Sequence, residues 1–178
     1  MQYFWDKVNG KPVRVASDSP LPVENPPAKE IAPSVTVDTS AYTAGDCIGG
    51  KLTLTDAMRV NGGTGILQSL FLLDRSGTQK PALEILIFNA DPSSSTLTDQ
   101  AAVSIHANDV GKIIRRMPIA AGDWGLVAGI YMADLSPGSR MLQSAAGSKN
   151  LYAAIVATGT PTFTATTNLS IRFGLMRD

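Results

Sequence analysis

The chain has 178 residues, of which 44% are hydrophobic, and its 15 basic and 15 acidic side chains cancel. This length predicts one domain, or one domain with an arm, that needs neither disulfide nor metal to stay folded. A neutral chain lacks the basic footprint of a nucleic-acid-binding protein, so we expect no nucleic-acid partner. Acidic residues dominate before residue 110 and basic ones after it, which either aligns subunits head to tail or reflects scattered solvated charges.

The N-terminus has no basic stretch followed by an apolar run, so it does not read as a signal peptide. No apolar run approaches the ~20 residues of a membrane span, and we expect a soluble protein with no membrane partner. Cys47 is the single cysteine, so no intrachain disulfide can form. A small buried hydrophobe is a more ordinary role for Cys47 than a reactive thiol.

Residues 1–33 predict an extended, proline-rich arm, because six of the eleven prolines lie there. Each proline fixes φ, removes a backbone donor and favours an extended residue before it. Within the arm, residues 16–33 predict a polyproline-II-like linker that reaches on the order of 50 Å. Such a segment can reach another molecule but cannot form a core of its own.

A possible β-hairpin occupies residues 3–15, where Asn9-Gly10 separates two apolar runs and both residues accept positive φ. An isolated two-stranded hairpin is marginal in water, so its aromatic side chains need a covering surface. Either the hairpin docks on a partner or adjacent subunit, or it folds back on its own domain. The docking hypothesis makes an N-terminal, partner-binding anchor of Tyr3, Phe4, Trp5, Val8, Pro12 and Val13.

The body, residues 34–178, alternates between strand and turn patterns. We expect residues 65–73 and 83–88 to pair as an antiparallel hairpin, a short helix near 99–104, and an edge strand or bulge at Pro118. About eight strands without a helical period predict an all-β fold, an antiparallel β-sandwich of jelly-roll type behind the arm. The other predicted strands cover residues 35–38, 51–55, 112–119, 126–133, 150–157, 163–166 and 169–175.

The body offers little catalytic chemistry. His106 is the only histidine, which excludes a His-based metal cluster, and no Gly-x-Ser-x-Gly elbow points to a catalytic relay. Glu84 is its only glutamate, and most Asp residues adjoin predicted turns, which disfavours a glycosidase carboxylate pair. Asn89, Asp91 and Asp99 could offer oxygens to Ca²⁺ but lack EF-hand spacing. We expect no catalytic residue, no metal and no cofactor.

Two further groups have both a functional and an ordinary interpretation. Lys112, Arg115 and Arg116 form a small basic group, for which a solvated strand edge is a sufficient explanation. Trp124 and Tyr131 either stack on a sugar or lie in the core. If they stack on a sugar, the chain has an alternative function as a receptor- or glycan-binding module of a head or tail fibre.

Residues 35–120 resemble small structural proteins of tailed-bacteriophage virions. The resemblance is carried by Tyr-x-x-Gly-Asp-x-Ile-Gly-Gly at 42–50 and by Phe-Asn-x-Asp-Pro-Ser at 88–93, followed by Asp99. It implies a head decoration (cement) protein, a β-sandwich or jelly roll that forms homo-oligomers, often trimers, on a capsid lattice. It carries no catalytic residue over to this chain.

The sequence therefore favours a non-enzymatic protein that decorates or cements a phage capsid at capsomer junctions, with the arm as anchor. The expected partners are the major capsid protein and further copies of the chain. The expected location is the capsid surface of the virion, after synthesis in the host bacterial cytoplasm. An enzyme is the least favoured reading.

Overall fold

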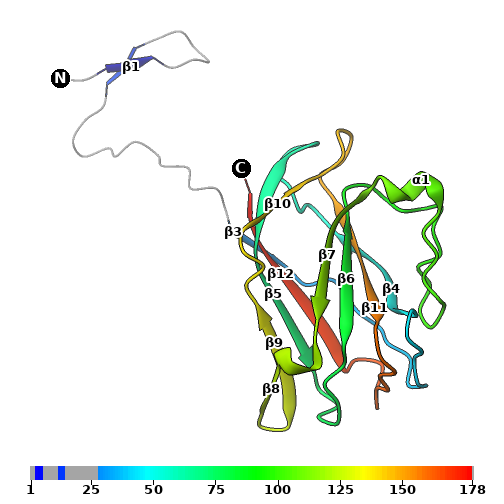
Figure 1. Cartoon of the computed structure of the whole chain (residues 1–178). Coiled ribbons are helices and arrows are strands. Elements are labelled where there is room, and N and C mark those ends of the chain that lie inside the picture. The colour runs from blue at the N-terminus through cyan, green and yellow to red at the C-terminus, as the bar shows by residue number, and fades with distance from the viewer. Residues whose placement is uncertain (1–2, 6–11, 15–27, 178) are drawn as a thin grey trace.

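The computed structural model describes residues 3–5, 12–14 and 28–177, and their regular structure is almost entirely β (Figure 1). The all-β fold class is therefore confirmed. The strands are β1 (Tyr3–Trp5), β2 (Pro12–Arg14), β3 (Ala28–Ile31), β4 (Cys47–Leu54), β5 (Thr64–Asp74), β6 (Leu83–Phe88), β7 (Ile113–Ile119), β8 (Trp124–Val127), β9 (Ile130–Leu135), β10 (Arg140–Gln143), β11 (Leu151–Ala157) and β12 (Leu169–Arg177), with short helices α1 (Ala107–Val110) and η1 (Ala121–Asp123).

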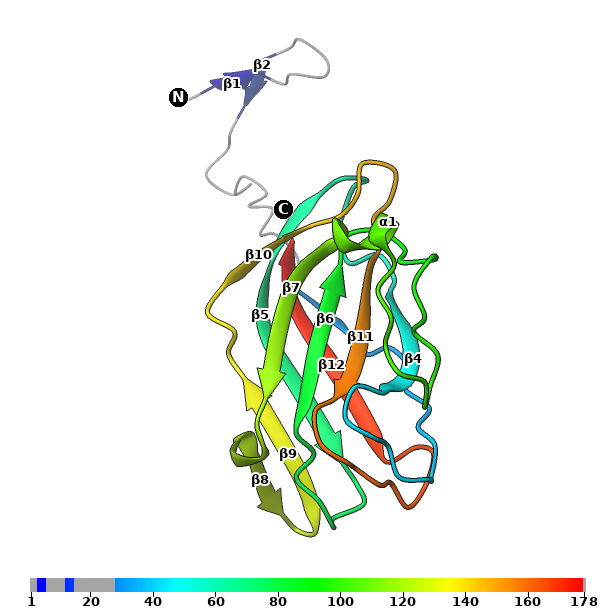
Figure 2. The same ribbon diagram turned by 45° about the vertical axis from the view of Figure 1, so that its right-hand side comes forward.

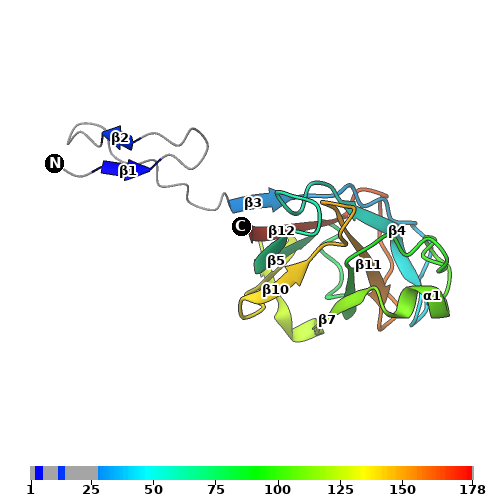
Figure 3. The same ribbon diagram turned by 90° about the horizontal axis from the view of Figure 1, so that it is seen from above.

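Two antiparallel sheets build the body. One has the order β3-β12-β5-β9-β8, with β10 also paired to β5, and the other has the order β4-β11-β6-β7. Figure 2 shows β7, β6, β11 and β4 side by side in front of β5 and β12, and Figure 3 shows the layers from above. The chain passes from one sheet to the other at β3/β4, β4/β5, β5/β6, β7/β8, β10/β11 and β11/β12, which is the arrangement of a jelly roll. The predicted β-sandwich of jelly-roll type is confirmed.

Alternating burial along β5 shows how the sheets pack. Leu67, Leu70 and Leu72 are fully buried and face the opposite sheet, while Ser69 and Phe71 are partly exposed and Gln68 is exposed. The alternation slips at Gln68, opposite a register shift in β12, which marks a β-bulge. The core filled by both sheets also contains Leu54, Ile85, Ile87, Trp124, Ile155, Ile171 and Phe173.

The predicted hairpin between residues 65–73 and 83–88 is wrong. β5 pairs with β9, β10 and β12, whereas β6 lies in the opposite sheet and pairs with β7 and β11. Strands that follow one another in sequence usually neighbour each other in space, but a jelly roll departs from that tendency. Residues 75–82 carry the chain from one sheet to the other, so both strands bury a face against each other instead of sharing an edge.

The helix predicted near 99–104 is also wrong, since the short helix α1 begins at Ala107. Residues 99–104 instead bond to the start of β4, where the Cys47 N–H donates to the Ala101 carbonyl at 2.9 Å. His106 precedes α1 and caps it, because its Nδ1 accepts from the Asn108 N–H at 3.1 Å. A side chain that caps a helix end fixes where the helix starts more firmly than an alanine-rich pattern does.

Three of the predicted strands are absent or divided in the structure. The segments 35–38 and 163–166 are not regular strands, although the Val37 N–H donates to the Thr166 carbonyl at 3.0 Å. The single strand predicted over 126–133 is a hairpin of β8 and β9, because Ala128 and Gly129 take positive φ of 50° and 82° and reverse the chain.

Pro118 lies in β7, which pairs only with β6 and is an edge strand among the described residues. The expectation for Pro118 is therefore confirmed.

The N-terminal strands β1 and β2 pair antiparallel, with Phe4 opposite Val13, as expected of a hairpin. Val8 and the Asn9-Gly10 turn lie outside the described residues. β3 pairs with β12, and Ile31 is only 8% exposed, so residues 28–31 belong to the sheet. The linker predicted over 16–33 therefore ends earlier, and the body begins at residue 28 instead of 34, because Ile31 completes the core at this edge.

The loop of residues 89–112 lies over the outer face of the β4-β11-β6-β7 sheet. Cys47, Phe88, Leu97 and Ala154 are buried there as a second, smaller core. Figure 1 shows this loop, in green with α1, beside β4 and β11. This sheet is thus covered on both faces, which explains why β11 is apolar along nearly its whole length.

Candidate interaction surfaces

The motif at residues 42–50 and Asp99, both part of the virion-protein resemblance, meet in one hydrogen-bond network. The Tyr42 hydroxyl donates to Asp99 Oδ1 at 2.8 Å and accepts from the Asp38 N–H at 2.7 Å. Asp99 Oδ1 also accepts from the Gly49 N–H at 2.6 Å. The Tyr42 ring is fully buried, edge-on to Phe163, and this burial raises the pKa of its phenol. The network joins the 38–50 segment to the 89–112 loop, so its role is structural.

Asp109 stabilises the loop of residues 89–112 through buried polar contacts. Its buried carboxylate forms an ion pair with Lys112 at 2.7 Å and accepts from the Ser95 hydroxyl at 2.7 Å and the Ser94 N–H at 2.9 Å. The hydrogen bonds from Lys112 and Ser95 lower the pKa of Asp109. The loop therefore owes its shape to fixed polar contacts as well as to the small core beneath it.

Two of the three residues considered for Ca²⁺, Asp91 and Asp99, have other partners for their carboxylates. Asp91 forms an ion pair with Lys51 at 2.6 Å, its backbone carbonyl accepts from Lys112 at 2.6 Å, and Asp99 belongs to the tyrosine network. Within residues 28–177, no three His, Cys, Asp or Glu side chains are grouped to hold a metal ion.

His106 and Cys47 both have structural positions. His106 is exposed at the start of α1, and its backbone N–H donates to Ser95 Oγ at 3.1 Å. Cys47 is fully buried, and desolvation together with the charge of Asp99 raises the pKa of its thiol to about 11. At neutral pH this thiol is protonated, which makes it a poor nucleophile.

Trp124 and Tyr131 do not form an exposed aromatic platform. Trp124 is only 2% exposed, and its Nε1 donates to the Pro81 carbonyl at 2.8 Å. Tyr131 is half-buried, with the Lys80 ammonium 5.7 Å from its ring centroid. The Trp124 ring lies in the core, so it offers no face for stacking on a sugar.

The outer face of the β3-β12-β5-β9-β8 sheet presents apolar side chains to solvent. Met141 on β10 and Met176 on β12 both pair with Ile66 on β5, and they are 67% and 39% exposed. Leu126 and Val127, at the end of β8, are also more than half exposed, although as successive strand residues they point to opposite faces of the sheet. Grouped, exposed apolar side chains are typical of surfaces that contact other molecules.

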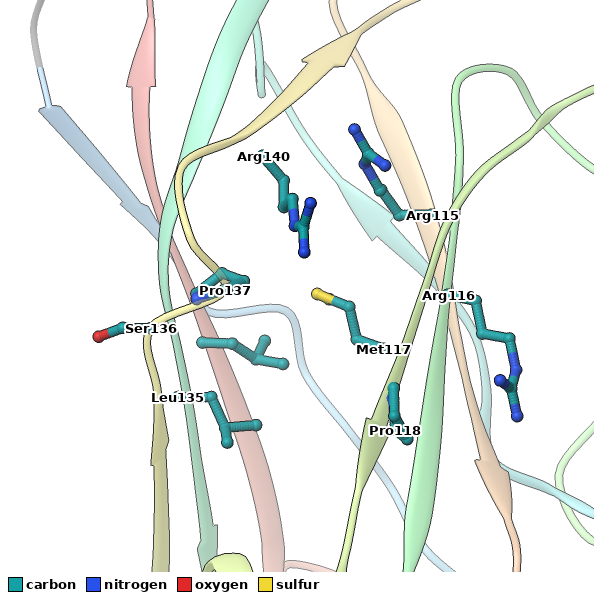
Figure 4. Close-up of a pocket in the computed structure, with 9 residues that line it drawn as sticks. Arg115, Arg116, Met117, Pro118, Leu135, Ser136, Pro137 and Arg140 are labelled. Carbon is teal, nitrogen blue, oxygen red and sulfur yellow. The ribbon is translucent and has the colours of Figure 1, made fainter.

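A pocket of about 380 Å³ opens between the two sheets (Figure 4). Its sides are the edge strand β7 and the segment 136–139, which joins β9 to β10. Because β9 and β10 pair with successive parts of β5, this segment interrupts what is otherwise one long strand. Gly138 and Ser139 take positive φ of 71° and 52° in the interruption. The pocket is lined by Leu70, Arg115, Arg116, Met117, Pro118, Leu135, Ser136, Pro137 and Arg140.

Strand alternation separates the two arginines of β7. Figure 4 shows Arg115, Met117 and Arg140 directed into the pocket, whereas Arg116 points away from it. Arg116 pairs with Glu84 through two nitrogens, and its Nη2 lies 2.7 Å from Glu84 Oε2. This hydrogen-bonded carboxylate raises the pKa of Arg116.

The basic group predicted from Lys112, Arg115 and Arg116 is therefore not one patch. Each of the three side chains has a different environment, and only Arg115 faces into the pocket. Arg140 was not recognised in the sequence, because nothing in the pattern shows that the 136–139 interruption brings it opposite Arg115.

The predicted anchor residues Tyr3, Phe4, Trp5, Pro12 and Val13 lie in β1 and β2, and Val8 lies outside the described residues. Their role in binding a partner remains a prediction. No model of a known protein family matches this chain, and no curated protein does either. Among the described residues, no helix has the length and apolar character needed to cross a membrane.

Proposed function

We propose that this chain is a non-enzymatic structural protein of a tailed-bacteriophage virion, which decorates or cements the capsid by binding at capsomer junctions. The observation that carries the proposal is the network of Tyr42, Gly49 and Asp99. Tyr42 and Gly49 belong to the motif at residues 42–50, and both bond to Asp99, which lies about 50 residues further along the chain. The network lies within a jelly roll, a fold that also builds viral capsid domains, and this combination supports the proposal.

The anchor in this proposal is the part of the chain before β3. From residue 14 to residue 28 an extended chain spans at most about 50 Å, enough to reach beyond a neighbouring subunit. Aromatic side chains such as those of Tyr3, Phe4 and Trp5 contribute strongly to interfaces when a partner buries them. The prolines already restrict the free chain, so ordering it on the partner costs less entropy.

The partners in this proposal are the major capsid protein and further copies of the chain, with a trimer favoured. The exposed apolar face at Met141, Ile66 and Met176 supports a second contact besides the anchor. A typical specific contact buries about 1,600 Å², and linking two contacts in one molecule increases the overall affinity. The proposed location is the capsid surface, after synthesis in the host bacterial cytoplasm.

Two truncations test the anchor. A chain that lacks residues 1–27 should keep its fold and lose binding to purified particles that carry no copies of the protein. A chain that lacks residues 1–33 should in addition lose stability, because it also lacks β3 and the buried Ile31. Particle binding is measured by cosedimentation, and folding by circular dichroism. Full binding by the shorter truncation would refute the anchor.

A further inference from the structure

We propose that the pocket beside β7 binds an acidic peptide segment, whose carboxylate lies between Arg115 and Arg140 and whose neighbouring apolar side chain packs on the pocket floor. This inference goes beyond the proposed function, because it concerns a separate surface and does not depend on a capsid.

The two guanidinium groups supply the first argument. Arg115 Nε is buried and has no hydrogen-bond partner among the described residues, within which its Nη2 reaches only the Met141 carbonyl, at 3.5 Å. A buried N–H without an acceptor carries an uncompensated desolvation cost, which a ligand oxygen would remove. Among the ion pairs of the described residues, neither Arg115 nor Arg140 has a carboxylate partner. Two positive charges thus face one pocket without a counter-charge.

The floor of the pocket supplies the second argument. Leu70 is fully buried, Met117 is 9% exposed, and Leu135 packs against the core beside them. An inorganic anion would leave the apolar side chains of the floor exposed to water. A purely apolar ligand would leave the guanidinium groups without a counter-charge. A carboxylate suits the planar fork of a guanidinium, and an apolar group next to it suits the floor. The volume, about 380 Å³, lies at the small end of ligand pockets and suits a short segment.

The edge strand supplies the third argument, which favours a peptide. Among residues 28–177, β7 pairs with β6 on one side only, so its other side presents backbone groups to the pocket. An extended peptide can bond to such an edge while its side chains enter adjoining pockets. Pro118 has no N–H to donate, so it adds no donor to this edge.

The test titrates the full chain with the peptide acetyl-Pro-Leu-Pro-Val-Glu-Asn-amide, which copies residues 20–25 and places a valine next to a carboxylate. Binding is measured by calorimetry and by the arginine Nε–H signals in NMR spectra. We expect the Arg115 signal to shift on binding. Arg140→Gln and Arg115→Gln should each weaken binding by at least about tenfold, since each removes a charged hydrogen-bonding partner.

Three controls decide the outcome. Arg116→Gln should bind as the wild type does, because Arg116 is paired with Glu84 outside the pocket. The same peptide with Gln in place of its Glu should bind at least about tenfold more weakly. Inorganic phosphate at the peptide's concentration should not displace it.

Unchanged amide spectra away from the pocket establish that each variant is folded. The proposal is overturned if the peptide does not bind in the millimolar range, or if Arg140→Gln binds it as well as the wild type does. It is also overturned if the Gln peptide binds as tightly as the Glu peptide, or if phosphate competes equally, which would indicate a general anion site.

Discussion

Replacing Tyr42 with Phe tests whether the network at the resemblance motifs stabilises the fold. The substitution keeps the buried ring against Phe163 and removes only the hydroxyl, which bonds Asp99 and the Asp38 N–H. Losing a hydrogen bond to a charged group costs about 1.5–3 kcal/mol, and losing a neutral one costs about 0.5–1.5 kcal/mol. Because Asp99 is half-buried and keeps its bond from Gly49, we expect the low end, about 2 kcal/mol in the free energy of unfolding.

For a domain of this size, a loss of about 2 kcal/mol lowers the melting temperature by about 4–8 °C. Urea denaturation and calorimetry measure both quantities. The matched control is Tyr131→Phe, because the Tyr131 hydroxyl has no hydrogen bond among those of the described residues, and we expect a change within about 0.5 kcal/mol. A Tyr42→Phe change as small as this control would refute the structural role of the network.

The Tyr42 phenol also gives the prediction a pH dependence. Its pKa is raised above the unfolded value of 10.0, so its contribution is complete below pH 10 and is lost as the pH rises further. The stability of the wild type should therefore fall more steeply than that of Tyr42→Phe above pH 10. If the stabilities of the wild type and of Tyr42→Phe fell in parallel above pH 10, the burial of a neutral phenol would be contradicted.

Three further substitutions test other parts of the fold. The pKa of Asp109 is lowered from 3.8, so its ionised carboxylate stabilises the fold above about pH 4, and this stabilisation is lost as the pH falls through the folded value. Asp109→Asn should therefore be less stable than the wild type at pH 7 and should lose less stability on acidification. Wild-type and Asp109→Asn stabilities that fall equally with pH would contradict this. Trp124→Ala should cost about 3–5 kcal/mol in urea denaturation, whereas a small loss would mean that the side chain is not in the core. Gly49→Ala should cost at least about 1–2 kcal/mol, because φ is +71° and the new Cβ would lie 2.5 Å from Val35 Cγ1, and Gly122→Ala, where that space is open, should cost less.

Periodicity in the sequence predicted those parts of the fold that depend on one strand and its own burial. The segments 65–73, 150–157 and 169–175 coincide closely with β5, β11 and β12, because each strand must place an apolar face on the core. Pro118 likewise indicated an edge strand, because a proline has no backbone N–H to donate, and a strand between two neighbours needs its N–H groups for pairing.

Pairing between strands could not be derived in the same way. The alternation in residues 83–88 shows that one face is buried, but it does not show whether the strand joins β5 or lies opposite it. The end of the linker was missed for a related reason, because residues 28–31 become a strand only through pairing with β12. The Arg115–Arg140 pocket depends on the 136–139 interruption, whose position is fixed by pairing to β5 and not by local pattern.

The most direct test of the proposed function is the amount of this chain in purified virions, measured by quantitative mass spectrometry against the major capsid protein. The account predicts a fixed, stoichiometric ratio between the two proteins in the particle. Absence from the particle, or only the trace amount expected of a tail or portal component, would contradict a role on the capsid surface.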